Sequence, residues 1–217
     1  MKTSAYAVLG GTFDPIHYGH LKLALYYSKL LQIDKVHLMP CYAPVHKDKP
    51  AIAVADRLNL LQLAITSDSE FSAHLQIDER EIIRNRPSYT IDTLNQLRSE
   101  LSSETPVYFI MGLDSFANLE SWHSWQELLS LTNILVSYRT DASYQLSPQL
   151  TSYLAQYQTD NIDQIKQASH GCIFLDSQLE INISSSLIRN CLHNNTPLGS
   201  LVPNPVADYI NHNNLYK

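Results

Sequence analysis

The sequence predicts an α/β fold built on a doubly wound, open parallel sheet. Short apolar runs alternate along the chain with longer segments of helical periodicity, which is the order expected when helices connect parallel strands. Two of the apolar runs end directly in glycine, at Gly10-Gly11 and at Gly112. Because such sheets bind ligands at the carboxyl ends of their strands, we expect both glycine positions to lie at a binding site.

The elements follow one another from this pattern. The first apolar run ends in glycine, the second is closed by Pro40, and the third alternates apolar and polar residues, as a half-buried strand does. Strands are therefore expected at residues 5–9, 35–39, 71–77, 107–111, 133–138 and 172–175. Segments with apolar residues at helical spacing separate and follow them. Helices are expected at residues 20–31, 55–66, 90–101, 122–131, 147–158, from 184 onward and at 205–211.

Length and charge limit the kind of protein. A chain of 217 residues with 44% hydrophobic composition can bury a sizeable core, and we expect one domain over residues 1–217. The formal net charge is −6, which is unlike the diffuse basic surface that sequence-independent nucleic-acid binding needs. We therefore expect no nucleic-acid partner, and any positive charge used for binding must be local.

The cysteines and the first apolar run indicate a cytoplasmic protein. Cys41, Cys172 and Cys191 are odd in number and widely spaced, which argues against both a disulfide framework and a zinc ribbon. The first apolar run is five residues long before glycine breaks it, too short for a signal peptide or a membrane span. Reduced thiols and no membrane partner are the expectation.

The segment Gly-Gly-Thr-Phe-Asp-Pro-Ile-His-Tyr-Gly-His, residues 10–20, predicts a phosphate site. Glycines let the backbone approach a ligand closely, and His17 and His20 fall where the free N–H groups of the next helix point outward. Two other interpretations exist. A glycine turn after a strand is common and a histidine pair can cap or pack a helix, while zinc binding lacks a partner residue at ligand spacing.

A second segment, Ile-Ser-Ser-Ser-Leu-Ile-Arg at residues 183–189, outlines another anion site. Ser184 can cap the helix, so that the unpaired N–H groups and the forked guanidinium of Arg189 are available to phosphate oxygens. Alone, the same pattern also fits a serine-capped surface helix with an exposed arginine. The presence of the first segment favours the anion site.

Together these two segments resemble the bacterial nicotinate-nucleotide adenylyltransferases, and the resemblance runs over almost the full length. Further matching segments are residues 44–47 (Pro-Val-His-Lys), 85–90 (Asn-Arg-Pro-Ser-Tyr-Thr), 111–115 (Met-Gly-Leu-Asp-Ser), Trp122 and 201–206 (Leu-Val-Pro-Asn-Pro-Val). The resemblance implies a Rossmann-like nucleotidylyltransferase fold. It also implies transfer of AMP from ATP to nicotinate mononucleotide, which yields nicotinate adenine dinucleotide and pyrophosphate in NAD biosynthesis.

The resemblance also implies roles for individual residues. His17, His20 and Arg189 would act on the phosphates as catalytic groups. The ATP site would comprise Gly10, Gly11, Thr12, Phe13, His17, Gly19, His20, Gly112, Asp114, Ser184, Ser185 and Arg189. Asp114 has a second interpretation as a residue that only caps the following helix.

The nicotinate half would rest on the middle segments. His46 and Lys47 would neutralise the mononucleotide phosphate, and Trp122 would stack on the pyridine ring. The backbone of Ser88, Tyr89 and Thr90, at a helix start, would offer N–H groups to the ring carboxylate. The alternatives are a solvated loop at residues 44–50 and a core position for Trp122 with Trp125.

Departures from the family pattern, the metal and the competing functions complete the prediction. The family commonly has Pro-Pro-His-Lys where this chain has Val45, and Pro-Gly where it has Thr140-Asp141, so Arg139 is left out of the site. Mg²⁺ is expected to arrive with ATP, without protein ligands, because no carboxylate cluster stands beside either segment. A homo-oligomer is possible. The competing functions are a nucleotidylyltransferase for nicotinamide mononucleotide, phosphopantetheine or a sugar or polyol phosphate, a class I aminoacyl-tRNA synthetase, and a nucleotide sensor without turnover.

Overall fold

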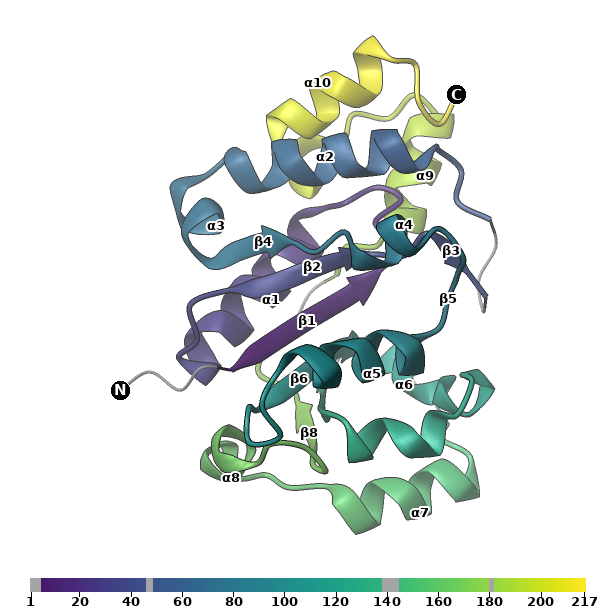
Figure 1. Cartoon of the computed structure of the whole chain (residues 1–217). Coiled ribbons are helices and arrows are strands. Elements are labelled where there is room, and N and C mark those ends of the chain that lie inside the picture. Colours follow the sequence, from purple (N-terminus) through teal and green to yellow (C-terminus); the bar gives the residue numbers. More distant parts are fainter. Residues whose placement is uncertain (1–4, 46–48, 138–144, 180–181) are drawn as a thin grey trace.

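The computed structural model describes residues 5–45, 49–137, 145–179 and 182–217, and within them it contains a six-stranded parallel sheet (Figure 1). The spatial order of the strands is β4-β2-β1-β6-β7-β8. Their bounds are β1 Tyr6–Gly11, β2 Val36–Pro40, β4 Leu75–Ile77, β6 Val107–Gly112, β7 Asn133–Ser137 and β8 Ile173–Asp176. The chain moves outward from β1 on one side and from β6 on the other, so the order reverses between these two strands. The predicted doubly wound sheet is confirmed.

Helices cover both faces of the sheet, with α1 on the far side and α5 and α6 on the near side in Figure 1. The α-helices are α1 Tyr18–Leu31, α2 Val54–Thr66, α3 Ser69–His74, α4 Arg80–Arg84, α5 Thr90–Glu100, α6 Leu113–Ala117, α7 Pro148–Tyr157, α8 Ile162–Gln167, α9 Ser185–His193 and α10 Asn204–His212. Three 3₁₀ helices are η1 Leu119–Ser121, η2 Trp125–Ser130 and η3 Gly199–Leu201. None of the helices in the described residues is long and apolar enough to cross a bilayer.

Alternate residues of the central strands enter two separate cores, one on each face. Leu9 of β1 and Ile110 of β6 pack with the apolar side chains of α1, α2 and α10. Val8 and Phe109, their immediate neighbours in sequence, pack with α5, η2 and α7 on the opposite face. Both faces of a parallel sheet are buried, so its strands are almost continuously apolar, which is the pattern that made them recognisable.

Two predicted elements are wrong. Residues 71–77 were expected to form one strand, but Phe71 lies in α3 and only Leu75–Ile77 form β4. Phe71 and Leu75 are both buried and four residues apart, a spacing that suits a helix as well as the alternation suits a strand. Residues 122–131 form no α-helix: Trp122 is extended and η2 begins at Trp125.

A two-stranded parallel ladder was not anticipated. Ala43–Pro44 (β3) pairs with Pro87–Ser88 (β5), so that Pro44 lies opposite Ser88. Strands of two residues leave no periodic signal in a sequence. The ladder nevertheless brings together the two middle segments that were assigned to the same half of the site, and Figure 1 shows it beyond the carboxyl ends of β1 and β2.

A partly buried histidine at the other end of the sheet makes stability depend on pH. The ring of His37 in β2 stacks on Tyr6 with centroids 4.0 Å apart. Burial lowers its pKa to about 4, with Arg80 and Lys35 acting in the same direction and Asp78 opposing them. His37 of the unfolded chain therefore takes up a proton near pH 6.5, whereas in the folded chain it does so only near pH 4. The free energy of unfolding falls as pH drops from about 6.5 to 4.

We expect His37→Phe, which keeps an aromatic ring on Tyr6, to reduce this sensitivity. The urea midpoint of the variant should fall less between pH 7 and pH 4.5 than that of the unchanged protein. Asp78 does not contribute to the pH dependence between pH 7 and pH 4.5. Burial raises the pKa of its carboxyl, but hydrogen bonds from Tyr6 and Arg80 lower that pKa further, so the stability that Asp78 contributes is lost only at more acid pH. Equal pH dependence of the two proteins would contradict the assignment.

Candidate active site

The first site segment forms the connection between β1 and α1. Gly10 and Gly11 end the strand, Phe13 adopts a left-handed conformation (φ 50°), and His17 is the extended N-cap residue of α1. The rings of His17 and His20 stack with centroids 3.6 Å apart, and the Phe13 ring meets His20 edge-on at 5.0 Å. Two imidazoles are thus held as one unit at a helix N-terminus, where negative charge is favoured.

The second site segment docks directly on the first. Arg189 Nη1 donates to the backbone oxygen of Asp14 at 2.7 Å, and the Ser185 hydroxyl donates to the backbone oxygen of Pro15 at 2.9 Å. Ser184 caps α9 as predicted, its Oγ accepting from Leu187 N at 3.1 Å. Residues 170 and more positions apart therefore share one wall. The Ser185 hydroxyl already donates to Pro15, whereas the Ser184 hydroxyl only accepts and can still donate its own proton. The groups available to an anion are therefore the Ser184 hydroxyl, the backbone N–H groups that begin α9 and the remaining donors of Arg189.

These segments line a cavity of about 780 Å³ at the carboxyl ends of β1 and β6. All of the residues predicted for ATP border it: Gly10, Gly11, Thr12, Phe13, His17, Gly19, His20, Gly112, Asp114, Ser184, Ser185 and Arg189. Lys49, which the sequence did not single out, borders it as well. The cavity lies where the strand order reverses, the usual ligand position in a doubly wound sheet.

Asp14 joins the turn to two distant parts of the chain. Its Oδ2 accepts from Ala51 N at 2.7 Å, and its Oδ1 accepts from the Tyr216 hydroxyl at 2.8 Å. Burial, followed by the charge of Asp14 and its hydrogen bond, raises the pKa of the Tyr216 phenol far above its usual range, so the hydroxyl remains a donor. Both carboxylate oxygens of Asp14 therefore connect the turn between β1 and α1 to Ala51 and to Tyr216.

Gly112 leaves room for the carboxylate of Asp114. Gly112 ends β6 and is the N-cap residue of α6, while Asp114 lies in the first turn of that helix. A Cβ at position 112 would stand 2.5 Å from Asp114 Oδ1, so any side chain there forces the carboxylate to move. Asp114 borders both this cavity and a second one, which places its carboxylate at their common wall.

Because ATP is the ligand that the sequence predicts for this cavity, we expect Gly112→Ala, through this displacement, to raise KM for ATP roughly 10-fold, which corresponds to about 1.4 kcal/mol. Only the end of a flexible side chain has to move, so the free energy of unfolding should change by less than about 1 kcal/mol. Steady-state kinetics and urea denaturation measure both quantities. In an Asp114→Ala background the glycine substitution should have no further effect on KM; additive losses would contradict this explanation.

The second cavity, of about 430 Å³, is bordered by the middle segments. Ser88, Tyr89, Thr90 and Trp122 all line it, as do Cys41, Pro44, Glu81 and His123. Tyr89 is the N-cap residue of α5 and Thr90 its first residue, so the predicted helix start is confirmed and its free N–H groups lie at this cavity. Tyr42 N donates to Ser88 Oγ at 3.0 Å, which ties the segment after β2 to β5.

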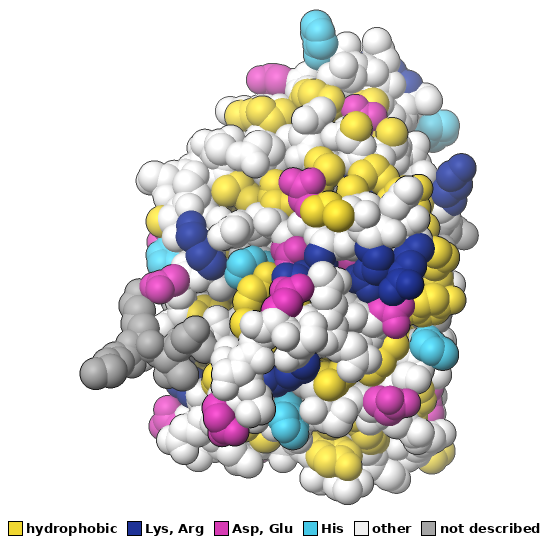
Figure 2. Space-filling view, viewed as in Figure 1, with side chains coloured by type: hydrophobic (Ala, Val, Ile, Leu, Met, Phe, Trp, Pro, Cys, Tyr) yellow, Lys and Arg dark blue, Asp and Glu magenta, His cyan; other side chains and the backbone are white. Residues whose placement is uncertain are grey.

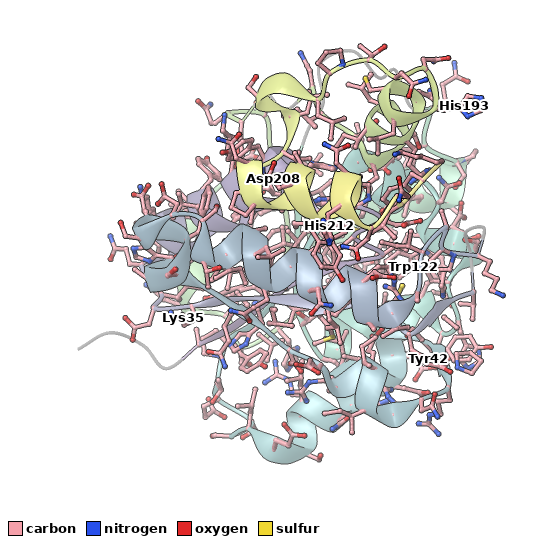
Figure 3. The ribbon with its side chains drawn as sticks, turned by 90° about the horizontal axis from the view of Figure 1, so that it is seen from above. Lys35, Tyr42, Trp122, His193, Asp208 and His212 are labelled. Atoms are coloured by element: carbon pink, nitrogen blue, oxygen red, sulfur yellow. The ribbon has the colours of Figure 1, made fainter. Side chains whose placement is uncertain are left out.

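Trp122 borders both cavities, whereas Trp125 belongs to the core. The Trp122 ring meets Phe109 edge-on with centroids 6.1 Å apart, and Trp125 packs edge-on against Tyr153 at 4.9 Å. Figure 3 shows Trp122 and Tyr42 toward one end of the molecule and Lys35, which precedes β2, at the other. Of the two tryptophans, only Trp122 is therefore placed to meet a ligand.

An acid also borders the second cavity. Glu81 Oε1 accepts from Thr93 Oγ1 at 2.7 Å, and burial raises the pKa of its carboxyl despite the hydrogen bonds from Thr93 and Ser88. On the face shown in Figure 2, lysine and arginine side chains gather over α4 and β5. Arg84 and Arg86 of this region approach Asp92 at 4.0 and 3.5 Å, so part of that charge is compensated.

Three predicted or considered residues, His46, Lys47 and Arg139, lie outside the described residues. Within residues 5–45, 49–137, 145–179 and 182–217, no group of three or more His, Cys, Asp or Glu side chains could hold a metal ion. Arg57 was not among the predicted site residues, and its guanidinium lies against the turn between β1 and α1. Its signal was present: Arg57 occupies a helical spacing with Leu60, Leu61 and Ala64, all of which are buried.

Comparison with known proteins gives the class that this fold and site define. The family model described as cytidylyltransferase-like matches residues 8–191, which include both site segments and the sheet apart from the first two residues of β1. The nicotinic acid mononucleotide adenylyltransferase of Plasmodium falciparum, solved in complex with NaAD, has the same fold, with a TM-score of 0.73 and 21% identity over 98% of this chain and 97% of that one. The protein is thus a cytidylyltransferase-like nucleotidyltransferase.

Curated relatives specify the family further. A protein from Cellvibrio japonicus, named "Probable nicotinate-nucleotide adenylyltransferase", is 41% identical over 210 residues, which are 97% of this chain and 97% of the relative. A protein of the same name from Marinomonas sp. (strain MWYL1) is 35% identical over 217 residues, 100% of this chain and 96% of the relative. The chain belongs to the nicotinate-nucleotide adenylyltransferase family.

Proposed function

We propose that this protein transfers AMP from ATP to nicotinate mononucleotide, producing nicotinate adenine dinucleotide and pyrophosphate in the synthesis of NAD. The single observation that carries the proposal is a pair of cavities with a common wall at the carboxyl ends of β1 and β6. One is bordered by a glycine turn, two histidines, Lys49 and Arg189, and the other by aromatic rings and a helix N-terminus. Two different reactants, one of them a polyphosphate, fit this division.

ATP occupies the larger cavity in this proposal. Its triphosphate lies over the glycine turn, between the stacked imidazoles of His17 and His20 and the start of α9 with Arg189. Backbone N–H groups at two helix N-termini, imidazoles and a guanidinium all favour negative charge. Asp114, at the common wall, is placed for the ribose hydroxyls, which a carboxylate can accept from.

Nicotinate mononucleotide occupies the smaller cavity. Trp122 offers a ring face to the flat pyridine, and the N–H groups at the start of α5 receive the ring carboxylate, a preference the helix dipole strengthens. An amide in the same place would put an N–H donor where the carboxylate has its second acceptor oxygen, facing the N–H donors of the helix. The buried carboxyl of Glu81 is held by Thr93 and Ser88, which keeps its oxygens directed to those hydroxyls. We assign His46 and Lys47 to the acceptor phosphate on the family resemblance alone.

The reaction is a direct displacement. An oxygen of the acceptor 5′-phosphate attacks the α-phosphorus of ATP, a P–O bond forms, and the bond to the bridging oxygen of the β-phosphate breaks, so that pyrophosphate leaves with the electron pair. A phosphate monoester is largely dianionic at neutral pH, so no general base is needed. The protein has to align two polyanions and stabilise the charge that moves onto pyrophosphate, which is the work of positioned cationic groups and N–H donors.

We propose that Mg²⁺ arrives with ATP, bound by phosphate oxygens and water, and that it neutralises charge on the phosphates. The acid nearest the turn, Asp14, has both carboxylate oxygens bonded to Ala51 and Tyr216, which supports a role in the turn rather than as a metal ligand. No residue of the chain is assigned to the ion.

The decisive experiment incubates the protein with ATP, Mg²⁺ and one acceptor at a time while pyrophosphate release is measured. Nicotinate and nicotinamide mononucleotides form the matched pair, since they differ only in carboxylate and amide. We expect rapid release with the acid and little with the amide. Preference for the amide, for phosphopantetheine or for a sugar or polyol phosphate would replace the acceptor, and ATP binding without release for any of them would indicate a sensor.

A further inference from the structure

Arg57 is a fully buried cation behind the wall of the active site. It lies on α2 with 1% of its surface exposed, at a helical spacing with the core residues Leu60, Leu61 and Ala64. Its Nη1 donates to the backbone oxygen of Thr12 at 2.8 Å and its Nη2 to that of Tyr42 at 3.2 Å. The guanidinium therefore joins the turn after β1 to the segment after β2.

The charge of Arg57 is in no direct ion pair with an acid of the part of the chain that the structure describes. Among the described residues no carboxylate oxygen lies within 4.0 Å of its nitrogens, and its buried Nε has no hydrogen-bond partner there. Asp14 and Arg57 shift the pKa of Tyr216 in opposite directions, and Glu81 and Arg57 do the same to the pKa of Cys41. The carboxylate oxygens of Asp14 bond to Ala51 and Tyr216, and that of Glu81 bonds to Thr93. A buried charge without a direct ion pair is costly.

The two carbonyls that Arg57 holds belong to segments that lie beside the two halves of the site. Thr12 lines both cavities, and Tyr42 follows Cys41, which lines the smaller one, and bonds through its own N–H to Ser88. The spacing between the donor and acceptor cavities is thus set in part by one planar group with two donors. Attraction between the buried guanidinium and an anion in the larger cavity acts in a medium of low dielectric, where it is stronger than in water.

We propose that Arg57 is a positioning residue for the reaction: an anion in the larger cavity compensates its buried charge, and its two carbonyl contacts hold the two reactants at the correct separation. This inference rests on the proposed function for the identity of the reactants. It assigns two separable properties to one side chain. The charge governs phosphate affinity, and the double contact governs the rate of the step that joins donor and acceptor.

Arg98 provides a matched control. Like that of Arg57, its guanidinium donates to backbone oxygens, those of Leu131, Thr105 and Ser169, each at 2.7 Å. These carbonyls precede β7, β6 and β8, at the amino ends of the strands and away from both cavities. A substitution at position 98 therefore removes an arginine of the same bonding type from the far end of the sheet.

The test measures pyrophosphate binding by calorimetry and steady-state kinetics for the unchanged protein, Arg57→Met, Arg57→Lys and Arg98→Met. Arg57→Met should weaken pyrophosphate binding about 10-fold or more, equivalent to about 1.4 kcal/mol, while Arg98→Met leaves it within about 2-fold. Arg57→Lys keeps the charge, but its single ammonium nitrogen cannot occupy the two positions from which Nη1 and Nη2 meet their carbonyls. It should bind pyrophosphate within about 3-fold of the unchanged protein and lose about 10-fold or more in kcat.

The outcomes separate the possibilities. Unchanged pyrophosphate affinity in Arg57→Met overturns the charge assignment, and an unchanged kcat in Arg57→Lys overturns the positioning assignment. Should Arg57→Met not fold, Arg57→Lys decides alone, because a loss of pyrophosphate affinity with the charge retained would contradict the inference. Failure of the proposed function shows instead as an unchanged protein that binds pyrophosphate but does not release it with nicotinate mononucleotide.

Discussion

We expect His20→Ala to lower kcat by roughly 10²-fold or more, the loss typical of removing one donor that stabilises transition-state charge. The His20 ring is held from two sides, by the stacked ring of His17 at 3.6 Å and by the edge of Phe13 at 5.0 Å. Such a rigid group needs little reorganisation as charge develops on the departing pyrophosphate. The effect should appear in kcat more than in KM, because the interaction strengthens only in the transition state.

Position 20 is a cleaner test than position 17. His17 is 1% exposed and is the N-cap residue of α1, so its removal affects folding as well as chemistry, whereas His20 is only partly buried on the first turn of that helix. The free energy of unfolding of His20→Ala, measured in urea, serves as the control and should stay within about 1 kcal/mol of the unchanged protein. Near-normal turnover in a folded variant would remove His20 from the catalytic groups.

The glycines and the capping serine were predictable because their reasons are local. The glycines at the ends of β1 and β6 indicate where these strands end, and in a parallel sheet the carboxyl ends of all strands lie at one edge. Ser184 precedes an amphipathic segment, which is enough to predict its role as a cap. These features gave the position of the larger cavity before any coordinates.

Short apolar segments were harder, because their periodicity fits two structures. Phe71 and Leu75 suit both a helix and the end of a strand, and Trp125, Leu128 and Leu129 repeat as an α-helix would although they form a 3₁₀ helix. In both cases the core receives the same side chains. The apolar pattern alone therefore did not decide the hydrogen-bond pattern of these segments.

Contacts between distant segments left no signal at all. The Tyr216 hydroxyl reaches Asp14 across 202 positions, and nothing near either residue indicates the pairing. The β3–β5 ladder is equally silent in the sequence. Arg57 is the intermediate case: a charged residue on the buried face of a helix is visible in the pattern, but its purpose depends on the two carbonyls it meets.

The second large effect is expected at Arg189, where lysine is a poor replacement. The guanidinium already donates to the Asp14 carbonyl at 2.7 Å and to Ser186 Oγ at 3.2 Å, and its other N–H donors remain for phosphate oxygens of ATP. A lysine ammonium carries its donors on a single nitrogen, so it cannot span the turn carbonyl and a phosphate oxygen as the guanidinium fork does. Arg189→Lys therefore loses one charged hydrogen bond.

A charged hydrogen bond contributes about 1.5–3 kcal/mol, so Arg189→Lys should raise KM for ATP by roughly 10- to 100-fold. The acceptor cavity is not bordered by Arg189, and KM for nicotinate mononucleotide should therefore stay within about 2-fold. Kinetics with each substrate varied in turn measure both values, and a urea titration shows whether α9 still docks on the turn. Equal loss for the two substrates in a stably folded variant would mean that Arg189 acts on the architecture of the whole site and not on the triphosphate.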